Sequence, residues 1–319
     1  MPVEAAPTTA RGGIIDGTAV AKKIRARVAE DVKKLGKRGT VPGLPVVLVG
    51  DDPASAAYVM SKGKASEEAG INGRTTRMPA STSQAELLDV VGRLNADPSV
   101  HGILVQMPLP KQIDPDSVIR CIDPRKDVDG FHPVNVGKLL IGDPEAFAPC
   151  TPAGVMILLR EYKVKTAGAN VVVIGRSNIV GKPMAMLLLQ ENATVTICHS
   201  RTRDLASITN QADILIAAIG RPGFVRGEHI RDGGTVIDVG INNVSDLDLV
   251  RQLFNEEEIE KRLDAITRRG STLVGDVHPA EVVKKAAAYT PVPGGVGLRT
   301  IAMLMRNTVE AAKRRRGIT

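Results

Sequence analysis

The segment Tyr58-Val-Met-Ser-Lys62 places an aromatic ring and a primary amine four residues apart in a stretch with a helical pattern. Positions i and i+4 of a helix share one face, so Ser55, Tyr58, Lys62 and Ser66 would form one narrow stripe. This stripe is too polar for a core and suits the wall of a cleft. A solvated lysine beside a partly buried tyrosine is the alternative interpretation.

A second candidate site is the glycine-bounded segment Gly175-Arg-Ser-Asn-Ile-Val-Gly181, which follows the apolar run Val171–Ile174 and precedes Pro183. A strand followed by such a turn and a helix start can bind pyrophosphate through free amides and the helix dipole. The match to the dinucleotide fingerprint is weak, because Ser177 replaces the second glycine and the third lies one residue late.

The end of the next strand, Thr194–Cys198, bears on the choice of cofactor. An NAD site usually has an acidic residue there, whereas this chain has His199, Ser200 and Arg201. Together with Arg176, two guanidinium groups and a hydroxyl could meet a 2′-phosphate, which favours NADP over NAD. Alternatively, both arginines are surface residues.

The elements that must position these residues alternate between short apolar runs and helical patterns, which indicates a parallel α/β fold. In the first half we expect a helix through Val20–Val32, a strand at 45–50, the Tyr58/Lys62 helix, a strand near 73–78, a helix near 84–94 and a strand at 102–106.

The strand-and-helix pattern restarts near residue 150, where we place a change of domain. We expect a helix that follows Pro149–Pro152 and runs to about Tyr162, a second parallel sheet from Val171 to about Val277, and a last helix from Ile301 to about Lys313. Two apolar strands of this sheet end at Gly220 and Gly240, where a ligand can approach the backbone.

Composition places the chain among ordinary globular proteins of about two domains, since it has 319 residues, 43% of them hydrophobic and 24% charged. No apolar run reaches the ~18 residues of a membrane span, and residues 1–12 resemble a disordered leader rather than a signal peptide. The three cysteines are scattered and the five histidines lack ligand spacing, so we expect a reducing, cytoplasmic compartment and no metal site.

The net charge of +7 and the basic segment Lys313–Arg316 raise the question of nucleic-acid binding. A basic run at the end of a helix usually complements the helix dipole, and no aromatic residues are interleaved with it to stack on bases. We therefore favour a small polyanion as partner, such as a dinucleotide phosphate or a substrate with several carboxylates.

Seven segments resemble one family in order and spacing: the bifunctional methylenetetrahydrofolate dehydrogenase/methenyltetrahydrofolate cyclohydrolases. The resemblance runs from about Ile14 to Met305. The segments are Tyr58–Lys62, Gln106–Pro110, Pro124–Gly130, Pro149–Pro152, Gly175–Pro183, Cys198–Thr202 and Pro291–Gly295.

The resemblance implies an α/β protein of two domains with a cleft between them. Residues 13–150 with a returning helix at 299–319 would be the folate-binding catalytic domain, and 151–298 a Rossmann-like NADP domain that pairs in a homodimer. NADP+ would oxidise 5,10-methylenetetrahydrofolate, and water would then open the methenyl product to 10-formyltetrahydrofolate. Two alternatives are a monofunctional dehydrogenase, linked to NADP or to NAD, and a catalytically silent folate-binding protein.

By the same resemblance, Lys62 would move protons in the hydrolysis, Gln106 would orient the amine or water, Tyr58 would stack on the p-aminobenzoyl ring and Asp129 would bond the pterin. Each has a simpler alternative, such as Gln106 satisfying loop amides or Asp129 forming an Asx turn like Asp127. The remaining assignments are Pro293, Gly294 and Gly295 for the substrate, and Gly175, Arg176, Ser177, Ser200, Arg201, Gly220, Gly240, Ile241 and Thr300 for the cofactor.

Two features depart from the family's usual pattern. Leu298 and Arg299 replace its Pro-Met, and we hypothesise that the Arg299 charge assists the substrate's carboxylate tail or the pyrophosphate, unless the side chain points to solvent. The segment 243–269 is longer than usual and carries the pairs Glu257/Lys261 and Glu258/Arg262. These pairs predict an added, solvated and peripheral helix. Thr300 could also be only the N-cap of the last helix, and Cys150 and Cys198 small buried hydrophobes.

Overall fold

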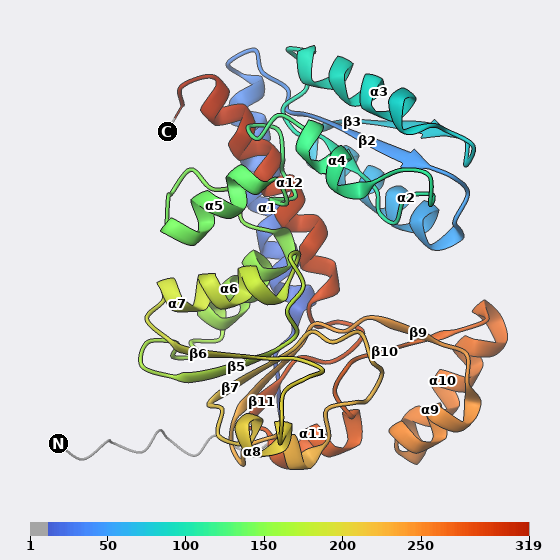
Figure 1. The fold of residues 1–319 in the computed structure, drawn as a ribbon, viewed down its shortest axis with the longest axis vertical. Coiled ribbons are helices and arrows are strands. Elements are labelled where there is room, and N and C mark those ends of the chain that lie inside the picture. The colour runs from blue at the N-terminus through green and yellow to red at the C-terminus, as the bar shows by residue number, and fades with distance from the viewer. Residues whose placement is uncertain (1–11, 319) are drawn as a thin grey trace. The chain divides into compact units, whose positions relative to one another are not determined.

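The computed structural model describes residues 12–318, apart from the side chains of Ala54 and Leu298. The chain forms two compact units (Figure 1). We call Ala21–Cys150 with Arg299–Thr319 the Lys62 unit, and Thr151–Leu298 with the segment up to Val20 the Gly175 unit. Residues 1–11 of the predicted leader lie outside the described residues, and Gly12 donates its backbone N–H to the Ala286 carbonyl at 2.9 Å.

The Lys62 unit is built on a parallel sheet with the order β3-β2-β4. Every residue of the central strand β2 is buried, as expected for a strand covered on both faces. One face is covered by α3 and α4, whose apolar residues pack on Val47 and Val49. The elements are α1 (Gly17–Gly36), β2 (Gly43–Val49), α2 (Pro53–Ala69), β3 (Asn72–Met78), α3 (Gln84–Ala96), β4 (Leu104–Val105), α4 (Pro115–Cys121), α5 (Pro133–Ile141) and α12 (Gly297–Arg315).

The Gly175 unit contains a six-stranded parallel sheet with the order β1-β11-β8-β7-β5-β6. Helices cover both faces, with α6 and α7 above the sheet and α8 and α11 below it in Figure 1. This doubly wound arrangement confirms the predicted two-domain α/β fold. The elements are β1 (Gly13–Ile14), α6 (Cys150–Glu161), β5 (Asn170–Ile174), α7 (Gly181–Gln190), β6 (Thr194–Cys198), α8 (Leu205–Thr209), β7 (Ile214–Ala217), a 3₁₀ turn (Gly227–His229), β8 (Thr235–Asp238), α11 (Pro279–Lys285) and β11 (Ala288–Tyr289).

Three boundaries differ from the prediction. Residues 13–20, which we assigned to the first domain, belong to the Gly175 unit because Gly13 of β1 pairs with Ala288 of β11. Strand β4 covers only two of the five residues predicted at 102–106, since Ile103 donates its N–H to the Lys126 carbonyl instead of to a strand. The last helix begins at Gly297, so Thr300 lies inside it and is not its N-cap.

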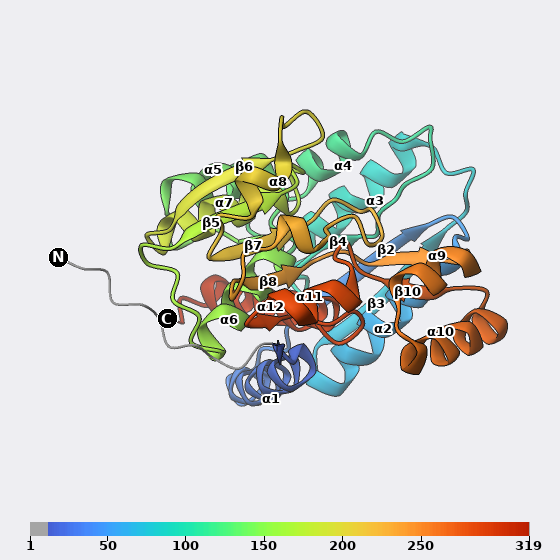
Figure 2. The ribbon, with the colours of Figure 1, turned by 90° about the horizontal axis from the view of Figure 1, so that it is seen from below.

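The longer segment after Gly240 forms a small substructure of its own. Strands β9 (Asn242–Val244) and β10 (Thr272–Val274) pair antiparallel, and between them run α9 (Leu247–Leu253) and α10 (Glu256–Arg269), which lie beside β10 in Figure 2. The predicted solvated helix is therefore present as α10. One of its faces nevertheless packs on α9, through a cluster that includes Leu263 and Ile266. Within residues 12–318, no helix is long and apolar enough to span a membrane.

Candidate functional site

Helix α2 positions Tyr58 and Lys62. The helix begins at Pro53, and its N-cap Asp52 accepts a hydrogen bond from the Ser55 N–H at 2.7 Å. It ends at Gly70, whose φ of 74° gives the left-handed turn that glycine tolerates best. Four residues apart on this helix, the Tyr58 side chain is 43% exposed and Lys62 only 9%, so a ring stands at the surface above a buried amine.

Gln106 is the hydrogen-bond partner of the Lys62 amine. The Lys62 Nζ donates to the Gln106 Oε1 at 2.9 Å, and the Gln106 Nε2 donates to the Met107 carbonyl at 2.6 Å. Because the Met107 carbonyl accepts from the NH₂ group, the carbonyl end of the Gln106 amide faces Lys62. The alternative, that Gln106 only satisfies the loop, accounts for one end of the side chain and not for the other.

The two carboxylates of the segment 127–129 have different roles. Asp127 is buried and accepts hydrogen bonds from the Phe131 N–H, the His132 N–H and the Asn135 Nδ2, at 3.2, 2.8 and 2.8 Å. Asp127 is therefore the turn residue. Among the described residues, none donates a hydrogen bond to the Asp129 carboxylate.

The pKa of Asp129 is raised to about 6 by burial, an effect that the Lys62 charge opposes and the Asp127 charge adds to. Lys62 and Asp129 therefore interact electrostatically within one unit, and Gln106 is bonded to the first of them. A neighbourhood of one amine, one amide and one carboxylate can both hold a polar ligand and exchange protons with it.

Two residues that the sequence did not single out fix the backbone beside Asp129. Asn307 on α12 donates from Nδ2 to the Val128 carbonyl at 2.8 Å and to the Ala148 carbonyl at 3.3 Å. Cys150 is buried, with its Sγ 3.4 Å from the Val128 carbonyl, and burial raises the pKa of this thiol. The signal for Asn307 was available, since this amide interrupts the buried face of the last helix.

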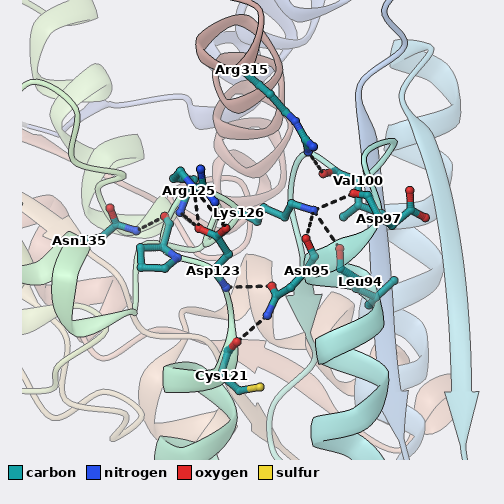
Figure 3. Close-up of polar contacts among 11 residues, drawn as sticks. Leu94, Asn95, Asp97, Val100, Cys121, Asp123, Arg125, Lys126, Asn135 and Arg315 are labelled. Carbon is teal, nitrogen blue, oxygen red and sulfur yellow. Dashed lines mark hydrogen bonds and ion pairs between the residues drawn. The ribbon is translucent and has the colours of Figure 1, made fainter.

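A pocket of about 860 Å³ lies elsewhere in the Lys62 unit, and none of the predicted catalytic residues lines it. Its cations already have acceptors (Figure 3). Lys126 donates to the carbonyls of Leu94, Asn95 and Asp97, Arg125 pairs with Asp123, and Arg315 donates to the Val100 carbonyl. These bonds join α12 and the segment 123–126 to the end of α3, so we assign the cations a structural role.

The predicted phosphate loop in the Gly175 unit needs both of its glycines. Gly175 has a φ of +136°, and a Cβ atom there would lie 2.2 Å from the Ala218 carbonyl oxygen. A Cβ atom on Gly181 would lie 2.1 Å from the Gly175 carbonyl oxygen. Only glycine allows this close approach of strand, turn and helix, and the resulting concave backbone fits a pyrophosphate at a helix N-terminus.

Ser177 partly fills the place that we expected free amides to occupy. Its Oγ accepts hydrogen bonds from the Val180 N–H at 3.1 Å and the Gly181 N–H at 3.3 Å. The hydroxyl hydrogen is then left to donate. A serine in place of the second fingerprint glycine therefore offers a ligand an O–H donor at the start of α7.

Arg176, Ser200 and Arg201 follow two adjacent strands. Ile174 of β5 lies opposite Cys198 of β6, and the Gly175 N–H donates to the Cys198 carbonyl at 2.9 Å. All three side chains are exposed. The parallel pairing therefore brings both predicted phosphate-binding segments to one edge of the sheet.

Two buried carboxylates, which the sequence analysis missed, hold the predicted glycine turns. Asp276 accepts hydrogen bonds from the backbone N–H groups of Ile219, Gly220 and Arg221 at 2.6 to 2.9 Å. Asp238 accepts from those of Gly240, Asp276 and Val277 at 2.9 Å each. Burial raises the pKa of Asp238 to about 7, against the effect of these amides.

The last predicted segment, Pro291–Gly295, forms a tight loop in the Gly175 unit. Gly294 has a φ of +103° and accepts a hydrogen bond from the Gly17 N–H at 2.9 Å. A Cβ atom on Gly295 would lie 2.3 Å from the Pro291 carbonyl oxygen. Pro293, Gly294 and Gly295 thus lie in a different compact unit from the other predicted substrate residues.

Three further predicted residues are Ile241, Thr300 and Arg299. Ile241, which directly follows Gly240, is 41% exposed. Thr300 is half-buried in α12 and belongs to the Lys62 unit, unlike the other predicted cofactor residues. Arg299 is fully buried, so the idea that its side chain points to solvent is wrong. The Leu298 side chain lies outside the described residues.

Comparison with known proteins gives one consistent result. Residues 15–129 match the family described as tetrahydrofolate dehydrogenase/cyclohydrolase, catalytic domain, and residues 149–316 match its NAD(P)-binding domain. The bifunctional protein FolD 2 of Geobacter metallireducens is 54% identical over 301 residues, which cover 94% of this chain and 97% of the relative.

Two solved structures are similar along nearly their whole length. The bifunctional FolD dehydrogenase/cyclohydrolase of Campylobacter jejuni has 45% identity and a TM-score of 0.85, covering 95% of this chain and 99% of its own. The Trypanosoma brucei dehydrogenase-cyclohydrolase, solved with NADP cofactor and an inhibitor, has 41% identity and a TM-score of 0.85, with coverages of 96% and 99%.

Proposed function

Because the chain belongs to the tetrahydrofolate dehydrogenase/cyclohydrolase family, we propose that Lys62, Gln106 and Asp129 form its catalytic group. The enzyme oxidises 5,10-methylenetetrahydrofolate with NADP+ and hydrolyses the methenyl product to 10-formyltetrahydrofolate. The observation that carries the residue assignment is the 2.9 Å hydrogen bond between the Lys62 Nζ and the Gln106 Oε1, next to an Asp129 carboxylate whose pKa is raised.

In the dehydrogenase step the chain's residues bind and orient. The hydride leaves a carbon that already lies between two nitrogens, so holding the reacting carbon in place contributes more than proton transfer. Asp129 accepts hydrogen bonds from the amide and amino edge of the pterin, and Tyr58 packs its exposed ring on the p-aminobenzoyl group. Pro293, Gly294 and Gly295 supply backbone contacts to the folate. When bound, NADP+ accepts the hydride.

In the cyclohydrolase step Lys62 moves a proton. Water adds to the cationic methenyl carbon, the new C–O bond forms, and the added water loses one proton. As one C–N bond breaks, its ring nitrogen gains a proton and the hydroxyl loses its remaining proton to become the formyl C=O, so that one proton is released overall. The Lys62 amine, held by the Gln106 oxygen, is placed to carry the proton that the water loses.

The residues that follow the adjacent strands β5 and β6 bind NADP. Arg176, Ser200 and Arg201 meet the 2′-phosphate with two guanidinium groups and a hydroxyl, and no carboxylate is present among residues 199–203 to select a 2′-OH. Ser177 donates to the pyrophosphate. Gly220, Gly240 and Ile241 line the route of the dinucleotide along the sheet edge, and Thr300 adds a hydroxyl.

We also propose that two copies pair through their NADP domains. Three apolar side chains of this domain, Ile179, Leu189 and Ile197, are 49%, 57% and 37% exposed, two of them on β6 and α7. Such a group on an edge strand and its helix suits an interface with a second copy. Light scattering across a concentration range should give the dimer mass. The three thiols of Cys121, Cys150 and Cys198 support a reducing, cytoplasmic location.

The direct test of the proposed function is an absorbance assay with purified enzyme. Adding methylenetetrahydrofolate in the presence of NADP+ should produce NADPH, and supplying the methenyl compound alone should lead to its loss faster than in buffer. NADPH formation without accelerated methenyl hydrolysis would leave a monofunctional dehydrogenase. The absence of both reactions would leave a silent folate-binding protein.

A further inference from the structure

Arg262 of α10 reaches the predicted folate loop. Its Nη2 donates to the Val292 carbonyl at 3.1 Å, and its Nη1 donates to the Leu273 carbonyl on β10 at 2.8 Å. Val292 immediately precedes Pro293 of the Pro291–Gly295 loop. The helix that we predicted to be peripheral therefore contacts the loop backbone directly.

The Arg262 side chain is itself held in place. It is only 15% exposed, and its guanidinium lies 4.4 Å above the Phe254 ring at the end of α9. Burial lowers the pKa of Arg262, and the Glu258 carboxylate, 3.9 Å away on the same helix, partly offsets this. The Arg262 guanidinium is buried, stacks on a ring and donates to two carbonyls, so its orientation is fixed. It can therefore hold the Val292 carbonyl in place.

The packing beside the first two residues of the loop, Pro291 and Val292, contains a gap. This cavity of about 30 Å³ is lined among others by Phe254, Thr290 and Val292. Side chains around a gap lose dispersion contacts on that side. Hydrogen bonds then fix the position of the loop, from Arg262 at Val292 and from Gly17 at Gly294.

We propose that Arg262 is a positioning residue for folate binding, through which the α9–α10 pair sets the affinity of the Pro291–Gly295 loop for its substrate. The proposal rests on the assignment of this loop to the folate. Arg262 touches neither ligand in this account and acts only through the Val292 carbonyl. The competing view is that the side chain only holds α10 on α9 and β10.

The test is Arg262→Met, which keeps an apolar stem over Phe254 and removes both donors. We expect the KM for methylenetetrahydrofolate and for the methenyl compound to rise about tenfold, while the KM for NADP+ stays within twofold. Arg262→Lys can bond one carbonyl and should recover part of the loss. The matched control is Arg268→Met on the same helix, whose side chain is 72% exposed and pairs with Asp264 at 2.8 Å, and it should match the wild type.

Unchanged folate KM values in a folded Arg262→Met variant would overturn the proposal, as would equal increases for folate and NADP+ together with a lower melting temperature. If the methionine variant does not fold, Arg262→Lys must show the same selective rise at smaller size, or the proposal fails. The wild type is assayed in parallel. An inactive wild type would contradict the proposed function, whereas an active wild type with an indifferent variant contradicts only the role of Arg262.

Discussion

The two units use carboxylates in opposite ways. Burial raises the pKa of Asp129 in the Lys62 unit to about 6 and that of Asp238 in the Gly175 unit to about 7. Asp238 and its neighbour Asp276 are surrounded by backbone N–H groups, which they hold in the turns at Gly220 and Gly240. Asp129 receives no such bond from the described residues, so its oxygens are available to a ligand.

The Asp129 carboxylate is therefore able to bind a ligand, whereas the Asp238 and Asp276 carboxylates hold the backbone. In the Lys62 unit, the groups that we propose to react or bind are side chains on α2, after β4 and in the segment 127–129. In the Gly175 unit, glycine turns shape the backbone and carboxylates stabilise it. Substitutions in the first unit should therefore change the chemistry or folate binding. In the second unit, substitutions at the turns near Gly175, Gly220 and Gly240 should change cofactor binding, whereas the Pro291–Gly295 loop and Arg262 are expected to affect folate binding.

The largest effect is expected for Lys62→Met, which keeps the length and removes the titrating amine. Methenyl hydrolysis should fall by about a hundredfold or more, the scale of a lost general acid-base group. The dehydrogenase should survive, because hydride transfer needs no proton from this amine. Absorbance assays of each half-reaction, started from its own substrate, measure both on one preparation. An equal loss of both activities would make Lys62 a binding residue.

Next in size is the preference for NADP+ over NAD+. A phosphate held by two charge-assisted contacts gains about 2 to 4 kcal/mol, or roughly 30- to 1000-fold in affinity. Arg176→Ala and Arg201→Ala should each reduce the ratio of kcat/KM values about tenfold. Arg231→Ala, which removes a cation paired with Asp213 in the same unit, serves as the control. A wild type with equal kcat/KM for the two cofactors would refute the assignment.

The third prediction concerns pH and Asp129. The ionised carboxylate accepts from the pterin, so kcat/KM for methylenetetrahydrofolate should fall about tenfold per pH unit below about 6 and level off above 7. Asp129→Asn should be lower at neutral pH by about tenfold and nearly flat across this range. If kcat/KM of Asp129→Asn falls below about pH 6 as in the wild type, another group is responsible for the titration.

The titration of Asp129 cannot lower kcat/KM at acid pH by unfolding the protein. The folded-state pKa of about 6 lies above the ordinary value of 3.8, so the folded state binds more protons between these values. This group's contribution to stability is therefore present below pH 4 and lost as the pH rises through 6. Stability and activity should change in opposite directions with pH, which thermal melts at each pH can follow.

A smaller effect is expected at Asp276, which holds the 219–221 turn. Asp276→Asn keeps the shape and replaces one acceptor oxygen with a donor, so at least one N–H of the 219–221 turn loses its partner. The KM for NADP+ should rise about fivefold and the free energy of unfolding should fall by about 2 kcal/mol, while the KM for folate stays within twofold. A rise in the folate KM alone would contradict the assignment of the 219–221 turn to the cofactor.

How much the sequence could predict follows from how local each feature is. The Tyr58/Lys62 helix and the strand that ends at Gly175 are each contained in one short segment, and both were confirmed. Gln106 and Asp129 entered only through the resemblance to a family, because no local pattern joins them to Lys62.

The missed features depend on contacts between residues far apart in the chain. Asp276 bonds amides 55 to 57 residues away, Asn307 reaches Val128 over 179 residues and Arg262 reaches Val292 over 30. The i,i+4 spacing of Glu258 and Arg262 predicted a solvated pair, yet the guanidinium turns to two carbonyls that the helical pattern could not reveal.

The central claim, that Lys62 serves the hydrolysis and not the hydride transfer, is tested most directly by one progress curve. Lys62→Met is mixed with methylenetetrahydrofolate and NADP+, and the absorbances of NADPH and of the methenyl compound are followed together. We predict that the two products accumulate in equal amounts, whereas in the wild type the methenyl compound stays well below NADPH. A variant that forms no NADPH, or whose methenyl compound disappears as fast as in the wild type, would contradict the account.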